Sequence, residues 1–223
     1  MRILILSLYL GISLSLFGQL QSGQSGPYPP VSLSSQDSTF LCMIPPLKIP
    51  ELYLGSNAPQ LPGSLDNSTQ PFFRGVFQQE QYSCGQASSV GYAFTYEINR
   101  ARNLPANIDE NRYPTHFVWN WMNGGNGWYG VSYYHTFQIL RKVGTPSVEA
   151  YGGMATGGPS RWINGYDNYY EGMKNRIHNA YAINTSTVEG ITYLKHWLHD
   201  HMEGSEVGGV ANFYANHPQL YNL

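Results

Sequence analysis

Cys84 and Gln78 are the residues whose types and spacing best suit chemistry in this sequence. Cys84 follows the polar run Gln78–Gln81, and apolar residues then recur every three or four positions. This pattern predicts a loop that delivers the thiol to the first turn of an amphipathic helix. Unpaired backbone N–H groups and the helix dipole stabilise thiolate over thiol there, and thiolate is the nucleophilic form. We therefore expect Cys84 to be a nucleophile.

The helix that positions Cys84 is expected to run to about Asn103. Arg100 and Arg102 fall in its last turn, where cations suit the helix dipole, and Asn103 suits the C-terminal cap. The apolar stripe comprises Ala87, Val90, Gly91, Phe94 and Ile98.

This segment resembles the active-site segment of the papain family of cysteine peptidases, in which a glutamine precedes the cysteine by six residues. Gln78 lies six residues before Cys84. The resemblance implies that the Gln78 amide and the Cys84 N–H form an oxyanion hole. The family signature C-G-[SA]-C-[WY] is only partly matched, because Ser83–Ser88 contains one cysteine and no tryptophan follows it.

A second register matches Cys84 to the first, structural cysteine of that signature. Gln81 then takes the glutamine position and Ala87 the nucleophile position, which would make the protein inactive. We favour Cys84 as nucleophile because the other cysteines of a structural disulfide are missing nearby. A disulfide between Cys84 and the only other cysteine, Cys42, is the structural alternative.

Gly124 and Gly125 follow Asn123 shortly before a predicted helix over residues 132–143, which Gly144 should end. In papain relatives an Asn-Gly-Gly at this place pairs its backbone with extended substrate. The resemblance therefore implies that Gly124 and Gly125 bind substrate, with a plain turn as the alternative.

The N-terminus predicts export. Residues 1–18 fit a signal peptide, with Arg2 before an apolar run, so we expect a secreted or periplasmic protein with no membrane attachment after cleavage. Residues 19–57, rich in Ser, Gln and Pro, are interpreted as a leader or linker. Residues 58–223 are interpreted as an incomplete peptidase domain, because 61–66 resembles the mature N-terminus of papain relatives.

Helices are also expected at 114–122, 166–176 and 188–203, with a strand at 208–214. The last of these helices carries His196 and His199 on one face, with His201 pointing off that face. The face is interpreted as polar and solvated, in preference to a zinc site, because a third placed ligand and an H-E-x-x-H motif are missing. The net charge of −2 favours neither nucleic acid nor an anionic membrane as partner, and we expect no cofactor or metal. A monomer acting on a peptide or protein is expected.

The resemblance implies an α+β papain-like fold, comprising mostly the helical left subdomain and the start of the β right subdomain. The catalytic His and Asn are expected beyond Leu223. His217 lies 133 residues after Cys84, within the family spacing, but it directly precedes Pro218, which is unfavourable in a central strand.

The function implied is that of a secreted cysteine-type endopeptidase (a thiol protease), of which this chain is a fragment inactive by itself. The alternatives are a catalytically inactive papain-like protein and a carbohydrate-binding or adhesion module, the latter suggested by the many Tyr and Trp residues.

Overall fold

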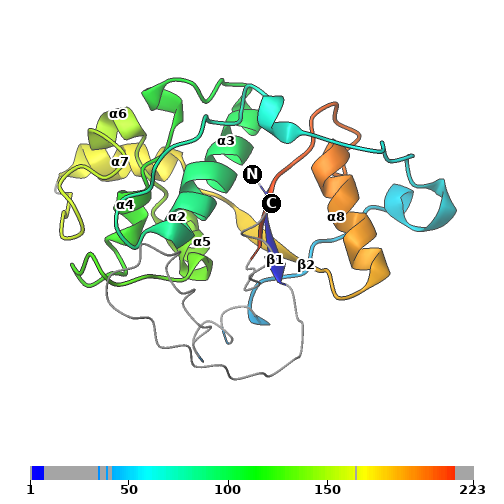
Figure 1. The fold of residues 1–223 in the computed structure, drawn as a ribbon, viewed down its shortest axis with the longest axis horizontal. Helices are drawn as coiled ribbons and strands as arrows, with labels where there is room; N and C mark the ends of the chain where they lie inside the picture. The colour runs from blue at the N-terminus through cyan, green and yellow to red at the C-terminus, as the bar shows by residue number, and fades with distance from the viewer. Residues whose placement is uncertain (1, 8–34, 36–38, 40–41, 164, 214–223) are drawn as a thin grey trace, which may run out of the picture.

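The computed structural model describes residues 2–7, 35, 39, 42–163 and 165–213. It has an α+β architecture, in which a body of helices packs beside a three-stranded parallel sheet (Figure 1). Within these residues, no helix combines the length and the apolar character that crossing a bilayer requires.

The central element is one continuous helical segment that changes its winding. It begins with α2 (Cys84–Gln86), continues as the π-helix η4 (Ala87–Phe94) and ends as α3 (Thr95–Arg102). Asn103 caps it in the left-handed conformation, with φ 53°. The predicted start at Cys84 and the predicted cap at Asn103 are therefore confirmed, whereas the π-helical winding was not foreseen.

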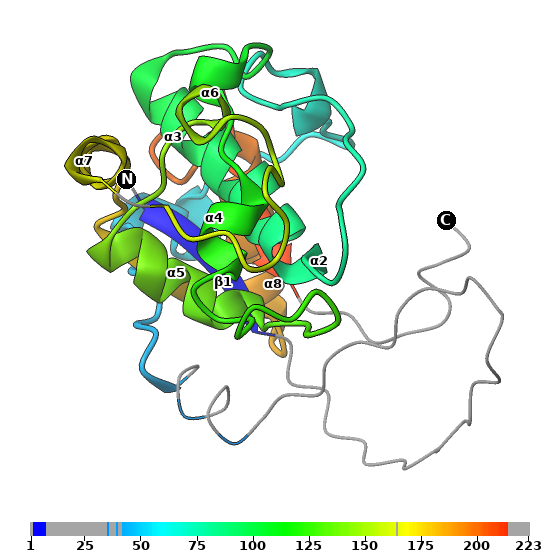
Figure 2. The same cartoon turned by 90° about the vertical axis from the view of Figure 1, so that its left-hand side faces the viewer.

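Further helices surround this segment. They are α4 (Thr115–Trp119), α5 (Tyr133–Lys142), α6 (Val148–Tyr151) and α7 (Tyr166–Lys174), with short 3-10 turns η1 (Glu51–Tyr53), η2 (Gly55–Asn57), η3 (Asn67–Thr69) and η5 (Asp109–Asn111). α2, α4 and α5 lie side by side (Figure 2). The helices expected at 132–143 and 166–176 are confirmed with slightly shorter bounds, whereas the helix expected at 114–122 forms only over Thr115–Trp119.

The main core lies between the central segment, α4 and α5. The predicted stripe of the central helix is buried in full, from Ala87 to Ile98. Phe94 packs edge-on against Tyr113, with ring centroids 4.8 Å apart. The fully buried residues of this main core include Val90, Phe94, Val118 and Leu140, each 0% exposed. This core fixes the direction of the helix, and with it the position of Cys84.

The sheet has the order β2-β1-β3, with all pairings parallel. β1 (Arg2–Ser7) is the central strand. It pairs along its whole length with β2 (Asn179–Asn184) and, from Leu4 to Leu6, with β3 (Ala211–Phe213). β3 falls within the strand expected at 208–214, while β2 was not predicted. The residues expected to form a signal peptide thus include a strand of the sheet.

A second apolar cluster lies against α8 (Val188–Asp200), on the other side of the sheet from α7 (Figure 1). Tyr53, Ile183, Trp197 and Met202 form its buried part. The Tyr53 hydroxyl donates to Asp200 Oδ2 at 2.7 Å. Residues from the segment interpreted as a leader therefore pack in this cluster.

The interpretation of the helix face with His196 and His199 as solvated was wrong for His196. His196 and His201 are 2% and 3% exposed, and only His199 remains partly exposed. His201 caps α8 in the left-handed conformation with φ 58°, which turns its ring inward against Trp197. The burial of His201 could not be predicted from its neighbours in the sequence, because its ring contacts the carboxylate of Glu97, 104 residues away.

Candidate functional site

Cys84 is exposed at the first residue of α2. The Ser83 carbonyl accepts hydrogen bonds from the N–H groups of Gln86 (3.0 Å) and Ala87 (2.8 Å), which starts the helix. The Cys84 N–H has no acceptor among the described residues. Cys42 and Cys84 are both free and exposed, so the alternative of a disulfide between them is wrong for this structure. An accessible thiol thus lies beside an available backbone donor.

Gly85 shows how closely the start of the helix approaches the loop before α5. A Cβ built on Gly85 would lie 2.5 Å from the Val131 carbonyl oxygen and 3.3 Å from the Tyr133 nitrogen. Only a residue without a side chain fits against that backbone. The glycine after Cys84 therefore allows the thiol-bearing turn to rest directly on residues 131–133.

Gln78 lies exposed in the loop before α2 and makes no hydrogen bond to any residue that the structure describes. The structure gives no contact between Gln78 and Cys84. The predicted oxyanion role of Gln78 stays a prediction.

Gln81, the glutamine of the second register, has the more defined environment. Its backbone is left-handed, with φ 55°, and its side-chain Oε1 lies 3.4 Å from His116 Nε2. A Cβ on Gly127 would lie 2.9 Å from Gln81 Nε2. The Tyr82 N–H donates to the Gly127 carbonyl at 3.4 Å. Gln81 and Tyr82 thus join the Cys84 loop to the glycine-rich loop.

His116, on α4, is fully buried behind Gln81. Burial lowers its pKa to about 4, so the imidazole is neutral at pH 7. Nδ1 lies 3.2 Å from the Thr115 hydroxyl, and the Trp119 ring packs edge-on at 4.7 Å. A buried neutral ring can orient Gln81 by a hydrogen bond. Sequence analysis missed this pairing because 35 residues separate the two.

Gly124 and Gly125 lie in an Asx turn. Both have positive φ, 61° and 77°, and the Gly125 N–H donates to Asn123 Oδ1 at 2.9 Å. Asn123 is 2% exposed and its amide also donates to the Pro159 carbonyl at 2.7 Å. A side chain at either glycine would be strained, so the turn alternative also accounts for both residues. The loop that holds them reaches the Cys84 loop through Gly127.

Ala87, the nucleophile position of the second register, is 7% exposed and packs in the core. A reacting group must be accessible to substrate, and Cys84 is the exposed position of the two. Accessibility therefore favours the register with Cys84 as nucleophile.

The described part of the chain offers Cys84 no hydrogen-bonded histidine, and His217 lies outside the described residues. Nor does that part contain a group of three His, Cys, Asp or Glu side chains placed to hold a metal ion. A cavity of about 360 Å³ lies between η4, α8 and β3, and its lining includes Tyr92 and Asn212 but not Cys84.

No protein-family model, curated protein or solved structure matches the chain.

Proposed function

We propose that this chain is part of an exported papain-like cysteine peptidase in which Cys84 is the nucleophile. The observation that carries the proposal is the exposed thiol at the first residue of a helix, next to a backbone N–H that has no acceptor among the described residues. This arrangement can stabilise both an attacking thiolate and an oxyanion that develops beside it.

The reaction is acyl transfer. The Cys84 sulfur attacks the carbonyl carbon of a peptide bond, and the oxygen becomes an oxyanion held by the Cys84 N–H and a glutamine amide. Collapse breaks the C–N bond, and the amine leaves with a proton from a histidine. Water then attacks the thioester, gives one proton to that histidine, and releases the acid and the Cys84 thiolate. The resemblance implies that this histidine, and the asparagine that orients it, lie outside the described residues.

Substrate is proposed to lie extended beside Gly124 and Gly125. Their loop is joined to the Cys84 loop by the Tyr82 hydrogen bond to Gly127 and by the packing of Gln81. A glycine backbone permits close main-chain pairing with a peptide, which gives affinity without demanding a particular side chain.

The experiment compares the two free thiols, because Cys42 is an internal control that is also exposed. In the full-length protein, Cys84→Ala should abolish peptide hydrolysis and Cys42→Ala should leave it unchanged. Iodoacetamide should alkylate Cys84 faster than Cys42 at neutral pH. Hydrolysis that survives Cys84→Ala would refute the proposal, while loss of hydrolysis in both variants would point to a folding defect and would require their unfolding curves.

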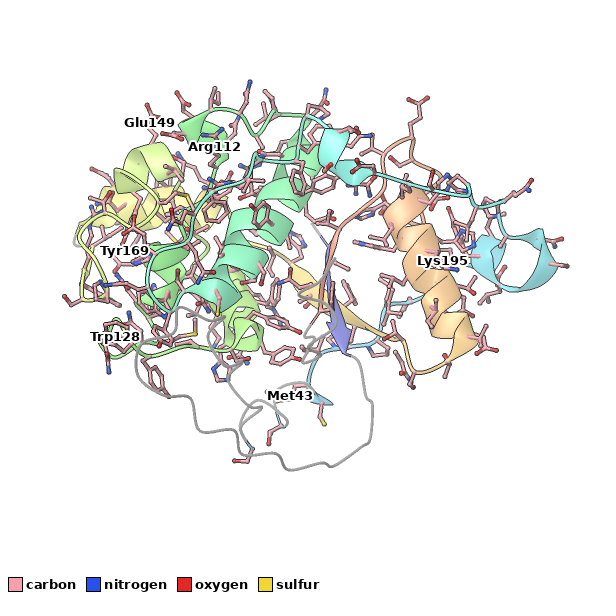
Figure 3. All side chains as sticks on the ribbon, in the orientation of Figure 1. Met43, Arg112, Trp128, Glu149, Tyr169 and Lys195 are labelled. Carbon is pink, nitrogen blue, oxygen red and sulfur yellow. The ribbon has the colours of Figure 1, made fainter. Side chains whose placement is uncertain are left out.

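A specific observation favours a second candidate, carbohydrate binding. Among the described residues, the exposed tryptophans and tyrosines all fall between positions 121 and 170, whereas the exposed aliphatic residues lie mainly elsewhere. Trp128 projects from the edge of the molecule (Figure 3) and is 77% exposed. Trp162 packs edge-on against Trp121, with centroids 4.7 Å apart, and is half exposed. Exposed aromatic faces can stack on the C–H faces of sugar rings.

Tryptophan fluorescence titrated with neutral soluble oligosaccharides separates the two candidates. A binding module should show saturable quenching that Trp162→Ala reduces, and Cys84→Ala should leave that quenching intact. Absence of quenching at millimolar sugar, together with Cys84-dependent hydrolysis, would leave the peptidase as the function.

A further inference from the structure

We infer that a cavity at the C-terminal end of α5 binds a small carboxylic acid with an apolar body. The cavity has a volume of about 230 Å³ and lies between α5, the start of β2 and residues 43–45. Pockets for drug-sized ligands span roughly 300–1,000 Å³, so this cavity suits a smaller molecule.

The floor of the cavity is apolar and held in place by the fold. Phe137 is 3% exposed and belongs to the main core, against which Ile44 and Ala180 also pack. Two backbone hydrogen bonds between residues 45–47 and Ala182, at 3.0 and 2.9 Å, fix the segment that carries Ile44 on β2. An apolar ligand body can therefore pack against a preformed surface, which lowers the ordering cost of binding.

Three polar side chains line the same cavity. Gln138 and Arg141 are three residues apart on α5, so they share one face of the helix. Neither side chain makes a hydrogen bond or ion pair with any residue that the structure describes. Asn179 Nδ2, on β2, lies 3.5 Å from the Tyr181 hydroxyl, which is a long contact. The donor groups of all three side chains are thus available to a ligand.

The charge of the lining selects the ligand class. Arg141 is the one charged residue of the lining, which contains no Asp or Glu. A guanidinium matches the two oxygens of a carboxylate in a bidentate pair. One positive charge beside an apolar floor favours a monoanion with an apolar body over a doubly charged anion such as phosphate.

The last turn of α5 does not oppose an anion at this place. Carbonyl groups at a helix C-terminus carry partial negative charge when they are unpaired. The Ile139 carbonyl accepts the N–H groups of Val143 at 2.7 Å and Gly144 at 3.1 Å. The Leu140 carbonyl accepts the Ile177 N–H at 3.2 Å. Protein donors therefore already satisfy these carbonyls.

The cavity is separate from the candidate peptidase site. Residues 131–133, which approach Gly85, lie at the opposite end of α5, and a helix of 10 residues is about 15 Å long. Cys84 does not line the cavity. The inference is thus independent of the proposed peptidase function, and either can fail without the other.

The test measures binding of phenylacetate to the full chain by saturation-transfer NMR. The ligand protons should receive saturation from the protein, whereas phenylethanol, which has a similar apolar body without the charge, should receive little. Arg141→Met should raise the Kd about tenfold, because a charge-assisted contact is lost. Lys142→Met is the matched control and should leave the Kd unchanged, since Lys142 is also exposed but does not line the cavity.

Competition identifies the source of the carboxylate. An N-acetylated peptide ending in a free phenylalanine should displace phenylacetate if the site takes peptide C-termini, and should fail to displace it if the site takes free small acids. Displacement by the same peptide as its C-terminal amide, or by inorganic phosphate, would overturn the inference. Equal binding of phenylacetate and phenylethanol, equal effects of the two variants, or no binding to the wild type would do the same.

Discussion

His201 Nε2 lies 2.8 Å from Glu97 Oε2, and both side chains are almost fully buried. Glu97 belongs to α3 and His201 ends α8, so this pair joins the central helix to the helix on the other side of the sheet. The second oxygen, Oε1, accepts the Val210 N–H at 2.9 Å, immediately before β3. One carboxylate therefore fixes the positions of three parts of the fold.

We predict that Glu97→Gln lowers the free energy of unfolding by about 1–3 kcal/mol, because an amide NH2 in place of one carboxylate oxygen leaves a buried hydrogen-bonding partner unsatisfied. The measurement is urea denaturation at pH 7. Glu110→Gln is the matched control, since Glu110 is exposed and its replacement should change stability by less than about 0.5 kcal/mol. If the two variants were equally stable, the Glu97–His201 pair would not hold the fold together.

His116 predicts a loss of stability in acid. Its folded pKa of about 4 lies below the unfolded value, so the unfolded chain binds the extra proton first as pH falls. The contribution of neutral His116 to the free energy of unfolding is present above about pH 6.5 and is lost as pH falls toward 4. About 2 kcal/mol of this contribution is lost between pH 7 and pH 5.

The check is the difference in unfolding free energy between pH 7 and pH 5, compared across variants. His116→Gln should show a difference smaller by about 2 kcal/mol than the wild type. His178→Gln should behave like the wild type, because His178 is exposed. A wild-type slope that His116→Gln leaves unchanged would mean that other groups cause the acid sensitivity.

The sequence predicted the parts of this structure that local signals determine. Ser132 and Gly144 bracket α5 as expected, and Cys84 and Asn103 bracket the central helix. The contacts that join distant segments were not predictable, because hydrophobic periodicity carries no information about partners 104 residues apart, as in the Glu97–His201 pair. The π-helical winding was missed for a related reason, since the stripe of apolar residues tolerates either winding.

The N-terminal strand gives a prediction about processing. Cleavage after residue 18, as proposed for an exported chain, removes β1 from between β2 and β3. A chain beginning at Gln19 should unfold several kcal/mol more easily than the chain that keeps β1, at about 1 kcal/mol for each net hydrogen bond lost. The measurement is urea denaturation of both forms, with the mass of the exported protein showing which form exists. Equal stability would show that β1 does not contribute to the folded state.

Gln78 and Gln81 are the two candidates for the oxyanion donor of the proposed peptidase, and they lie in different surroundings, so replacing each should have a different effect. Gln78 is exposed and makes no hydrogen bond to described residues, whereas Gln81 lies against Gly127 with its Oε1 3.4 Å from His116. The loss of one oxyanion donor lowers kcat by about 10²–10³-fold. If Gln78 is the donor, Gln78→Ala should show this loss with unchanged alkylation of Cys84, because the amide acts on the transition state and not on the thiol. Gln81→Ala should then reduce stability more than kcat.

The reverse pattern would assign the role of oxyanion donor to Gln81. It would mean that Cys84 aligns with the structural cysteine of the family signature while still supplying the exposed thiol. Equal, small effects of both variants on kcat would exclude a glutamine from the oxyanion hole altogether.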